Sequence, residues 1–154
     1  MNKKILTFVC ALALSLNISS YAKMSPRSNT LYNQAIMQEQ EGNYAQALEH
    51  IQAALKYSPD DAVLNIKLAG LYQNLGKHQE AISAYNKAIA LRPQDGFLYI
   101  SLANLFMQKY DYANALSMYE KAQAIMPEYK YNYLNIANCK QLIGNTDGAI
   151  AAYK

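Results

Sequence analysis

Apolar residues recur at helical spacing over most of the chain, in segments of about 12 to 14 residues that short polar turns separate. In AVLNIKLAGLYQNL, residues 62–75, one apolar stripe contains Leu68, Ala69 and Tyr72. In QEAISAYNKAIAL, residues 79–91, the stripe consists of Ala81, Ile82, Tyr85, Ala88 and Ile89. Each stripe fits one face of an amphipathic helix. The pattern therefore predicts two helices joined by a tight turn.

This helix pair repeats with a period of about 34 residues, the constant spacing of Pro59, Pro93 and Pro127. The same step relates three columns of alanine, namely Ala35, Ala69, Ala103 and Ala137; Ala47, Ala81, Ala115 and Ala149; and Ala54, Ala88 and Ala122. It also relates Tyr85, Tyr119 and Tyr153, with Ile51 in the first copy. We therefore divide the chain after residue 27 into repeats 28–61, 62–95 and 96–129 and an incomplete repeat 130–154.

Turn and cap residues recur with the same period. Gly42, Gly76 and Gly144 are placed to end the first helix of their copies in the left-handed conformation, whereas the third copy has Tyr110 there, which predicts a strained or different turn. Asp61 and Asp95 are placed to cap the helix that follows. The alanine columns predict the crossing points of each helix pair, because a larger side chain there would overpack the contact by about 1 to 3 kcal/mol.

The segment 1–22 has the features of a secretory signal peptide. A basic MNKK precedes the apolar run ILTFVCALALSLNI, and small residues at Ser20 and Ala22 follow. We expect cleavage between Ala22 and Lys23, a short leader at 23–27, and a periplasmic or secreted mature chain. The apolar run is shorter than the roughly 20 residues of a stable membrane span. An uncleaved interfacial anchor is the alternative.

Charge and cysteine content narrow the function. The 154 residues carry 14 Lys and Arg against 11 Asp and Glu, and loss of Lys3 and Lys4 with the signal leaves 12 basic groups. A near-neutral chain without a basic stripe lacks the footprint of a nucleic-acid binder. Cys139 remains as a single cysteine after cleavage, so we expect no internal disulfide. We expect Cys139 to be a buried small hydrophobe, with a reactive thiol as the alternative.

The repeat is similar to that of the tetratricopeptide repeat family, in an exported bacterial type of protein. The matching features are a small residue at position 8 of each copy, Ala at 20 and 27, an aromatic at 24 and Pro at 32, recurring across residues 28–154. Departures occur at position 4, which holds Leu31, Asn65, Tyr99 and Tyr133, and at Lys140. The resemblance implies an all-α, right-handed superhelical solenoid of antiparallel helix pairs, whose first helices line a concave groove.

Carried over position by position, that groove becomes the candidate peptide-binding site. Its residues would be Tyr32, Ile36, Val63, Ile66, Gln73, Phe97, Ile100, Asn104, Met107, Tyr131, Leu134, Asn138 and Gln141. In GFLYISLANLFMQK, one stripe already supplies the face that packs on the partner helix, while Phe97, Ile100 and Met107 form a second apolar stripe. Such surface usually marks a binding site, and the alternative is that curvature or further repeats cover it.

The chemistry of the groove predicts its ligand only as a class. Asn104 and Asn138 occupy equivalent places, and a carboxamide can hold both polar groups of an extended peptide bond. Relatives that clamp acidic chaperone tails use Lys or Arg at positions 2, 5 and 6, where this chain has only Lys67. We therefore expect an apolar or mixed protein or peptide ligand, extended or helical. Around the last helix we expect Tyr131 in the groove and Tyr133 in the core.

No constellation for catalysis is present in the sequence. His50 and His78 have no Cys, His or carboxylate nearby at metal-ligand spacing, and no nucleophile-elbow or phosphate-loop motif occurs. The sequence therefore predicts no enzyme, no metal and no cofactor, but a protein-binding scaffold or assembly factor of the bacterial periplasm or envelope. The alternatives are a fragment of a larger enzyme or secretion component, and a self-association module.

The final stretch DGAIAAYK, residues 147–154, stops before the Ala and Pro that its repeat should contain. Repeat arrays normally finish with a polar capping helix. We therefore expect Lys154 to mark a truncation. The apolar face around Ile136, Leu142 and Ile143 would then await further repeats or a partner.

Overall fold

The computed structural model describes residues 24–144 and Ala151, and its described part is built from helices and turns. The helices are α2 (Pro26–Gln40), α3 (Tyr44–Leu55), α4 (Ala62–Asn74), α5 (His78–Leu91), α6 (Gly96–Gln108), α7 (Tyr112–Ile125) and α8 (Lys130–Leu142). The predicted signal peptide and Tyr153 lie outside the described residues. None of the described helices is long and apolar enough to cross a membrane.

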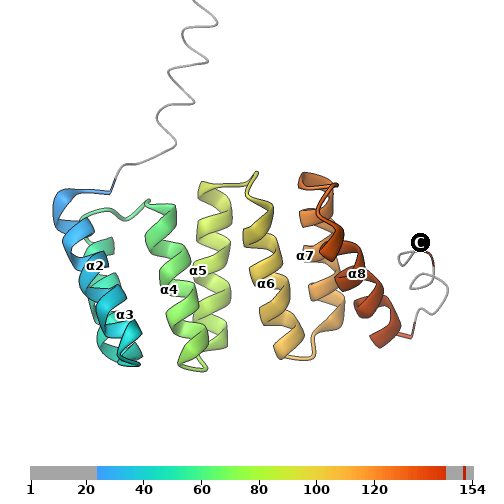
Figure 1. Cartoon of the computed structure of the whole chain (residues 1–154), viewed down its shortest axis with the longest axis horizontal. Helices are drawn as coiled ribbons and strands as arrows, with labels where there is room; N and C mark the ends of the chain where they lie inside the picture. Colours follow the sequence, from blue (N-terminus) through green and yellow to red (C-terminus); the bar gives the residue numbers. More distant parts are fainter. Residues whose placement is uncertain (1–23, 145–150, 152–154) are drawn as a thin grey trace, which may run out of the picture.

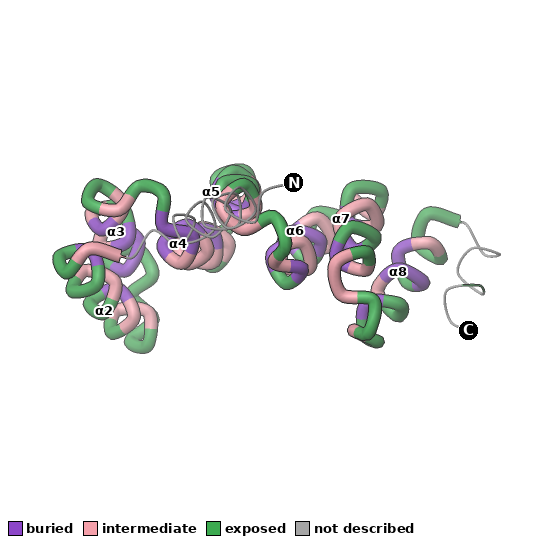
Figure 2. The backbone as a smooth tube through the Cα atoms, turned by 90° about the horizontal axis from the view of Figure 1, so that it is seen from above, coloured by how far each residue is buried: buried purple, intermediate pink, exposed green. Residues whose placement is uncertain are grey.

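The helices stack in chain order as antiparallel pairs, α2 with α3, α4 with α5, and α6 with α7, followed by α8 (Figure 1). Viewed along the helix axes, α2, α4, α6 and α8 lie on one side of the row and α3, α5 and α7 on the other (Figure 2). Each pair buries its own contact and also packs on the next pair. The predicted all-α solenoid of helix pairs is confirmed.

The predicted turn and cap residues adopt the expected conformations. Gly42, Gly76 and Gly144 have φ of 80°, 70° and 82°, and Tyr110 occupies the equivalent left-handed position with φ 60°. A side chain costs roughly 1 kcal/mol or more in this conformation, so the third turn is strained as predicted.

Side chains also cap the helices that follow the turns. Asp61 accepts a hydrogen bond from Leu64 N at 3.0 Å, and Asp95 accepts one from Phe97 N at 3.2 Å. Ser25 and Asp111 cap α2 and α7 in the same way. Each cap satisfies an amide that the first turn of a helix leaves unpaired.

The alanine columns form the innermost layer. Their described members are all 0% exposed: Ala35, Ala47, Ala54, Ala69, Ala81, Ala88, Ala103, Ala115, Ala122 and Ala137. Larger residues such as Ile51, Leu64, Leu71, Leu102 and Leu105 fill the space around them. The small columns therefore let the helices of each pair approach closely, as the sequence predicts.

Two predictions about α8 are wrong. Tyr133, expected in the core, is 45% exposed, and Ile136, expected on an open face, is only 6% exposed. The reason is the orientation of α8, which directs Ile136 and Cys139 into a cluster with Ala115 and Tyr119 of α7. Leu142 and Ile143 are 47% and 44% exposed, as expected for that face.

Candidate functional site

The sequence-predicted groove residues all lie on α2, α4, α6 and α8, the helices on one side of the row (Figure 2). None of the thirteen is buried. Half-buried members are Tyr32, Ile36, Val63, Ile66, Gln73, Ile100 and Met107, and exposed members are Phe97, Asn104, Tyr131, Leu134, Asn138 and Gln141. The structure therefore brings them onto one surface, which we call the first-helix face. Their role in binding stays a prediction.

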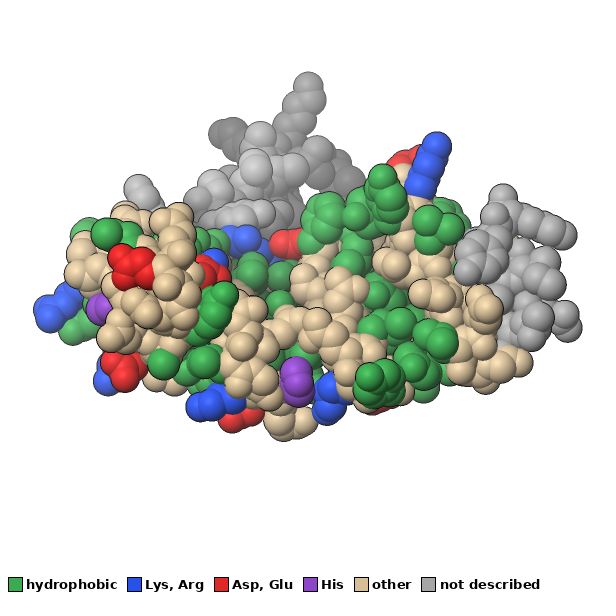
Figure 3. Space-filling view, turned by 60° about the horizontal axis from the view of Figure 1, so that its bottom comes forward, with side chains coloured by type: hydrophobic (Ala, Val, Ile, Leu, Met, Phe, Trp, Pro, Cys, Tyr) green, Lys and Arg blue, Asp and Glu red, His purple; other side chains and the backbone are tan. Residues whose placement is uncertain are grey.

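Exposure of the apolar members is concentrated on α6 and α8. Phe97, Tyr131 and Leu134 are 56%, 68% and 52% exposed, whereas the apolar members on α2 and α4 are half-buried. Figure 3 shows hydrophobic side chains gathered over the α6–α8 end, while charged groups are more frequent at the α2 end. The first-helix face is thus most accessible to an apolar ligand over α6 and α8.

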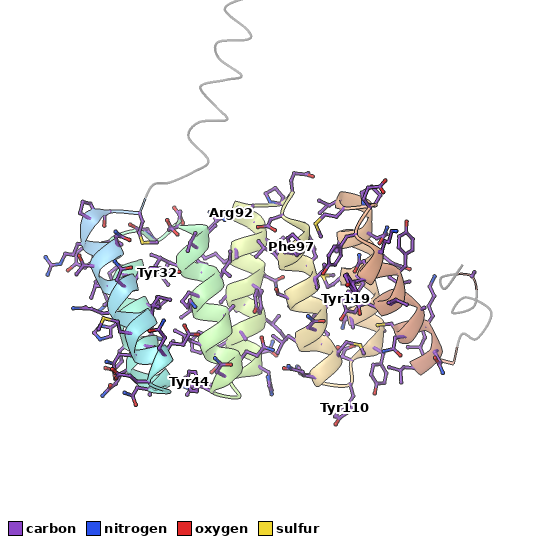
Figure 4. All side chains as sticks on the ribbon, viewed as in Figure 1. Tyr32, Tyr44, Arg92, Phe97, Tyr110 and Tyr119 are labelled. Carbon is purple, nitrogen blue, oxygen red and sulfur yellow. The ribbon has the colours of Figure 1, made fainter. Side chains whose placement is uncertain are left out.

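Three aromatic rings form a connected group where α6 and α8 begin (Phe97 is labelled in Figure 4). The ring of Phe97 meets that of Tyr129 edge-on, with centroids 5.5 Å apart and planes at 76°. Tyr129 in turn lies 5.6 Å from Tyr131. We call these residues the aromatic cluster. Sequence reasoning found Phe97 and Tyr131 but not Tyr129, whose place in EYKYNY, just before α8, is the signal that was available.

The amides on the first-helix face are held by tyrosines that recur at one position of the repeat. The hydroxyl of Tyr119 donates to Asn104 Oδ1 within the third repeat (Tyr119 is labelled in Figure 4). The second repeat has Gly70 where the third has Asn104, and there the Tyr85 hydroxyl lies 3.4 Å from Gln73 Oε1.

A third amide joins this system across the repeat boundary. Gln73 Nε2 donates to Gln108 Oε1 at 2.9 Å. Sequence reasoning missed these links, because they depend on side-chain conformation and not on periodicity.

Burial raises the pKa of both tyrosine hydroxyls above their ordinary value. Tyr119 is 3% exposed, and burial, assisted by the nearby Cys139 thiol, raises the pKa of its hydroxyl to about 12. Burial also raises the pKa of Tyr85, which a hydrogen bond with Ser101 lowers to a smaller extent. Both hydroxyls can therefore act as donors at neutral pH.

Cys139 is fully buried, which confirms its predicted environment. Its Sγ lies 3.4 Å from Met107 Sδ, and burial raises the pKa of the thiol to about 11. A protonated, inaccessible thiol is a poor nucleophile.

Lys67, the one base at the positions where some relatives clamp acidic tails, is already paired. Lys67 Nζ lies 2.8 Å from Glu39 Oε2, and both side chains are about one-quarter exposed, at 26% and 25%. This ion pair joins α2 to α4 on the first-helix face. An acidic ligand would have to compete with Glu39 for Lys67.

A pocket of about 380 Å³ lies outside the predicted site, at the contact of α3, α4 and α5. Its lining consists of Leu55, Pro59, Asn65, Leu68, Tyr72, Glu80, Ser83, Ala84 and Lys87. The available sequence signal was Ala84, since the equivalent positions one repeat before and after it hold His50 and Met118. Within the described part of the chain, no group of three His, Cys, Asp or Glu could hold a metal ion.

Comparison with known proteins agrees with the repeat. Residues 39–105 match the family described as Tetratricopeptide repeat. No curated protein sequence is significantly similar to this chain.

Solved structures have the same fold at low sequence identity. MamA (residues 41 to the end) from Desulfovibrio magneticus RS-1 is 18% identical, with a TM-score of 0.76 over 84% of this chain and 73% of that one. A tetratricopeptide repeat protein from Parabacteroides merdae is 19% identical, with a TM-score of 0.78 over 84% and 52%. The first tetratricopeptide domain of Spaghetti (RPAP3), bound to an HSP90 peptide, is 18% identical, with a TM-score of 0.71 over 80% and 98%.

Helix pairs that recur with one constant period and stack through alanine columns define a solenoid repeat protein. With the family match over residues 39–105 and these structural neighbours, the chain contains tetratricopeptide repeats and has the fold of a tetratricopeptide repeat protein.

Proposed function

We propose that this protein is a non-enzymatic scaffold that binds a protein or peptide on its first-helix face. The observation that carries the proposal is the exposed apolar surface of Phe97, Tyr131 and Leu134 beside the polar amide of Asn104. Apolar surface of this kind, edged by polar groups, usually marks a protein-binding site. The Spaghetti domain with its bound peptide supports the same use of the fold.

The ligand should differ from that of the Spaghetti domain. The peptide in that structure, SRMEEVD, carries three acidic side chains. In this chain the base at the clamp position, Lys67, is paired with Glu39, and α6 contains no charged residue. An uncharged ligand would lose less hydration than an acidic one on this surface. We therefore favour an apolar or mixed ligand.

The setting we propose is the bacterial periplasm or cell envelope, or the medium after secretion. The support for it is the basic leader, the apolar run and the small residues of segment 1–22. Fractionation of cells that express the full chain tests this setting: the mature chain should leave with the periplasmic fraction and begin at Lys23. An uncleaved chain in the cytoplasmic fraction would contradict it.

The test of binding is capture of partners from envelope extract by the purified chain and by a double variant, Phe97→Ala with Asn104→Ala. Ile100 is unsuitable because it packs against the buried cluster around Ala103 and Ala115. The double variant should lose specific partners while it keeps its helicity, because both side chains are exposed. Its melting temperature should fall only by the loss of the hydrogen bond from Tyr119 to Asn104.

The matched control is Tyr44→Ala with Asn86→Ala, which removes an exposed aromatic and an exposed amide from α3 and α5. This control should capture partners as the unchanged chain does. Equal capture by the Phe97/Asn104 variant would refute binding on the first-helix face.

Self-association is a second candidate, since Tyr133, Leu142 and Ile143 expose apolar surface on and just after α8. Light scattering on the purified chain decides it. A monomer at micromolar concentration would argue against this candidate, whereas a dimer that Leu142→Ser dissociates would support it.

A further inference from the structure

Within the described part of the chain, two amide side chains of α6, Asn104 and Gln108, have their oxygens engaged in hydrogen bonds and their NH2 groups free. This difference between donors and acceptors narrows the class of ligand. Asn104 Oδ1 accepts from Tyr119, and Gln108 Oε1 accepts from Gln73. Among the described residues, Asn104 Nδ2 and Gln108 Nε2 have no hydrogen-bond partner, and both residues are exposed. Helix α6 therefore offers the amide NH2 groups of Asn104 and Gln108 to a ligand, whereas their oxygens already accept hydrogen bonds from other side chains of the protein.

The hydrogen bond from the buried Tyr119 hydroxyl fixes the orientation of the Asn104 amide. The phenol of Tyr119 is 3% exposed and protonated, so its hydrogen requires an acceptor. Rotation of the amide by half a turn would leave this buried hydroxyl hydrogen unpaired, at a cost of about 1 to 3 kcal/mol. Tyr119 thus acts as a positioning residue that holds the Asn104 donor toward the ligand side.

Helix α6, which contains these donors, is uncharged and begins at a group of aromatic rings. The aromatic cluster of Phe97, Tyr129 and Tyr131 lies at one end of α6, and its rings meet at steep angles. Phe97 and Tyr131 are more than half exposed, so their ring surfaces are available for stacking. Helix α6 contains no Asp, Glu, Lys or Arg.

We propose, on the basis of the function above, that the α6–α8 part of the first-helix face binds a proline-rich segment in the polyproline II conformation. The backbone of that helix has no internal hydrogen bonds, so its carbonyls need donors, and proline has no N–H that would need an acceptor. Known domains that bind such segments offer aromatic-lined grooves. Exposed rings at the start of α6 and amide donors further along the same helix complement this ligand in both respects.

Other ligands fit the donor pattern less well. An ordinary extended peptide presents an N–H at every residue, and on α6 the side-chain oxygens of Asn104 and Gln108 that could accept from it are already engaged. An amphipathic helix satisfies its own backbone groups and would leave the Asn104 donor unused. Dependence of binding on Tyr119 therefore separates the proposed ligand from a helical one.

The test measures binding of fluorescein-labelled decaproline to the purified full chain by fluorescence anisotropy, with a Gly-Ser decamer as the comparison peptide. Decaproline should bind at least about tenfold more tightly, which corresponds to about 1.4 kcal/mol. Phe97→Ala should weaken binding about tenfold. Tyr119→Phe keeps the ring but frees Asn104 to rotate, and should weaken binding severalfold with little change in melting temperature. Tyr44→Ala is the control and should bind decaproline unchanged.

Equal affinity for the two decamers, or unchanged decaproline binding by Phe97→Ala, would overturn the proposal. A selection from a random peptide library on the same chain distinguishes this failure from that of the function itself. Selected peptides that need Phe97 and Asn104 but contain no excess of proline would refute the ligand class and support the binding face. Selected peptides that bind the Phe97→Ala, Asn104→Ala variant equally well would refute both.

Discussion

The contact between the first and second helix pairs differs from the contact between the second and third. The first contact, of α3 with α4 and α5, contains the pocket of about 380 Å³. Apolar residues at that contact are Leu55, Leu68, Tyr72 and Ala84, and their equivalents one repeat later are Ile89, Leu102, Phe106 and Met118. At the second contact Met118 packs against a cluster that includes Ala84, Tyr85 and Leu102.

The difference shows that positions conserved between the copies stack the repeats, whereas positions that vary between the copies set how much space remains at each contact. Three of the four apolar pairs are similar in size, so they stack the repeats alike. The changes from Ala84 to Met118 and from Asn65 to Tyr99 put larger side chains at the second contact, and Met118 packs there against the buried cluster. Asn65 and Tyr99 make equivalent hydrogen bonds in their repeats. Asn65 donates to the carbonyl of Pro59, and Tyr99 donates to the carbonyl of Pro93.

The largest expected effect concerns the alanines inside the second and third helix pairs, which these contacts join. Ala115→Leu adds three carbons where α6 and α7 cross, at a side chain that is 0% exposed, and should destabilise the chain by about 3 kcal/mol. Ala81→Leu, its equivalent in the second repeat, should cost about the same. Urea denaturation measures both, and a loss confined to one of them would show that the helix pairs are not equivalent.

Alkaline pH should act on a third contact, that of α7 with α8. The folded-state pKa of Tyr119 is about 12, above its ordinary value near 10, so the folded chain retains a proton that the unfolded chain releases. The contribution of Tyr119 to stability is therefore full below pH 10, and on the order of 2 kcal/mol should be lost as pH rises through 12. Cys139, with a pKa of about 11, should start the decline near pH 9.

Chemical denaturation between pH 8 and 12 measures this decline. Tyr119→Phe should flatten the part above pH 10, and Cys139→Ala the part below it. An unchanged slope in both variants would assign the loss to other groups.

Opening the filled contact should be milder. Met118→Ala would create a space between α5, α6 and α7 like the pocket at the first contact, and because Met118 is only half-buried the cost should be about 1 to 2 kcal/mol. Thermal unfolding gives the value. A cost below that of a typical surface substitution would mean that Met118 does not fill the contact.

Filling the open contact should have the smallest effect, with the opposite sign. Ala84→Met places in the pocket the side chain that its equivalent position already accepts, and should stabilise the chain by about 0.5 to 1 kcal/mol. Ala90→Met, at an exposed position of α5, is the control and should change stability little. Destabilisation by Ala84→Met would show that the neighbours of the pocket cannot accommodate the added chain.

The sequence predicts the helix pairs, the turn glycines and the buried alanine columns, because each follows from a period that recurs in several copies. It also predicts which residues share the first-helix face. The link from Tyr119 to Asn104 and the meeting of Tyr129 with Phe97 could not be predicted, because they depend on side-chain conformations at positions that vary between copies. The wrong predictions for Tyr133 and Ile136 have a similar origin, because which of the two side chains is buried depends on how α8 is rotated against α7.

The burial of Cys139 has a practical consequence for experiments on the dynamics of the solenoid. A thiol that is 0% exposed reacts with an alkylating reagent only when α8 separates from α7. At low reagent concentration, the modification rate then reports the equilibrium constant for that opening, as amide hydrogen exchange does. In the proposed mature chain, which lacks Cys10, alkylation of Cys139 thus measures fraying at the α8 end without an engineered label.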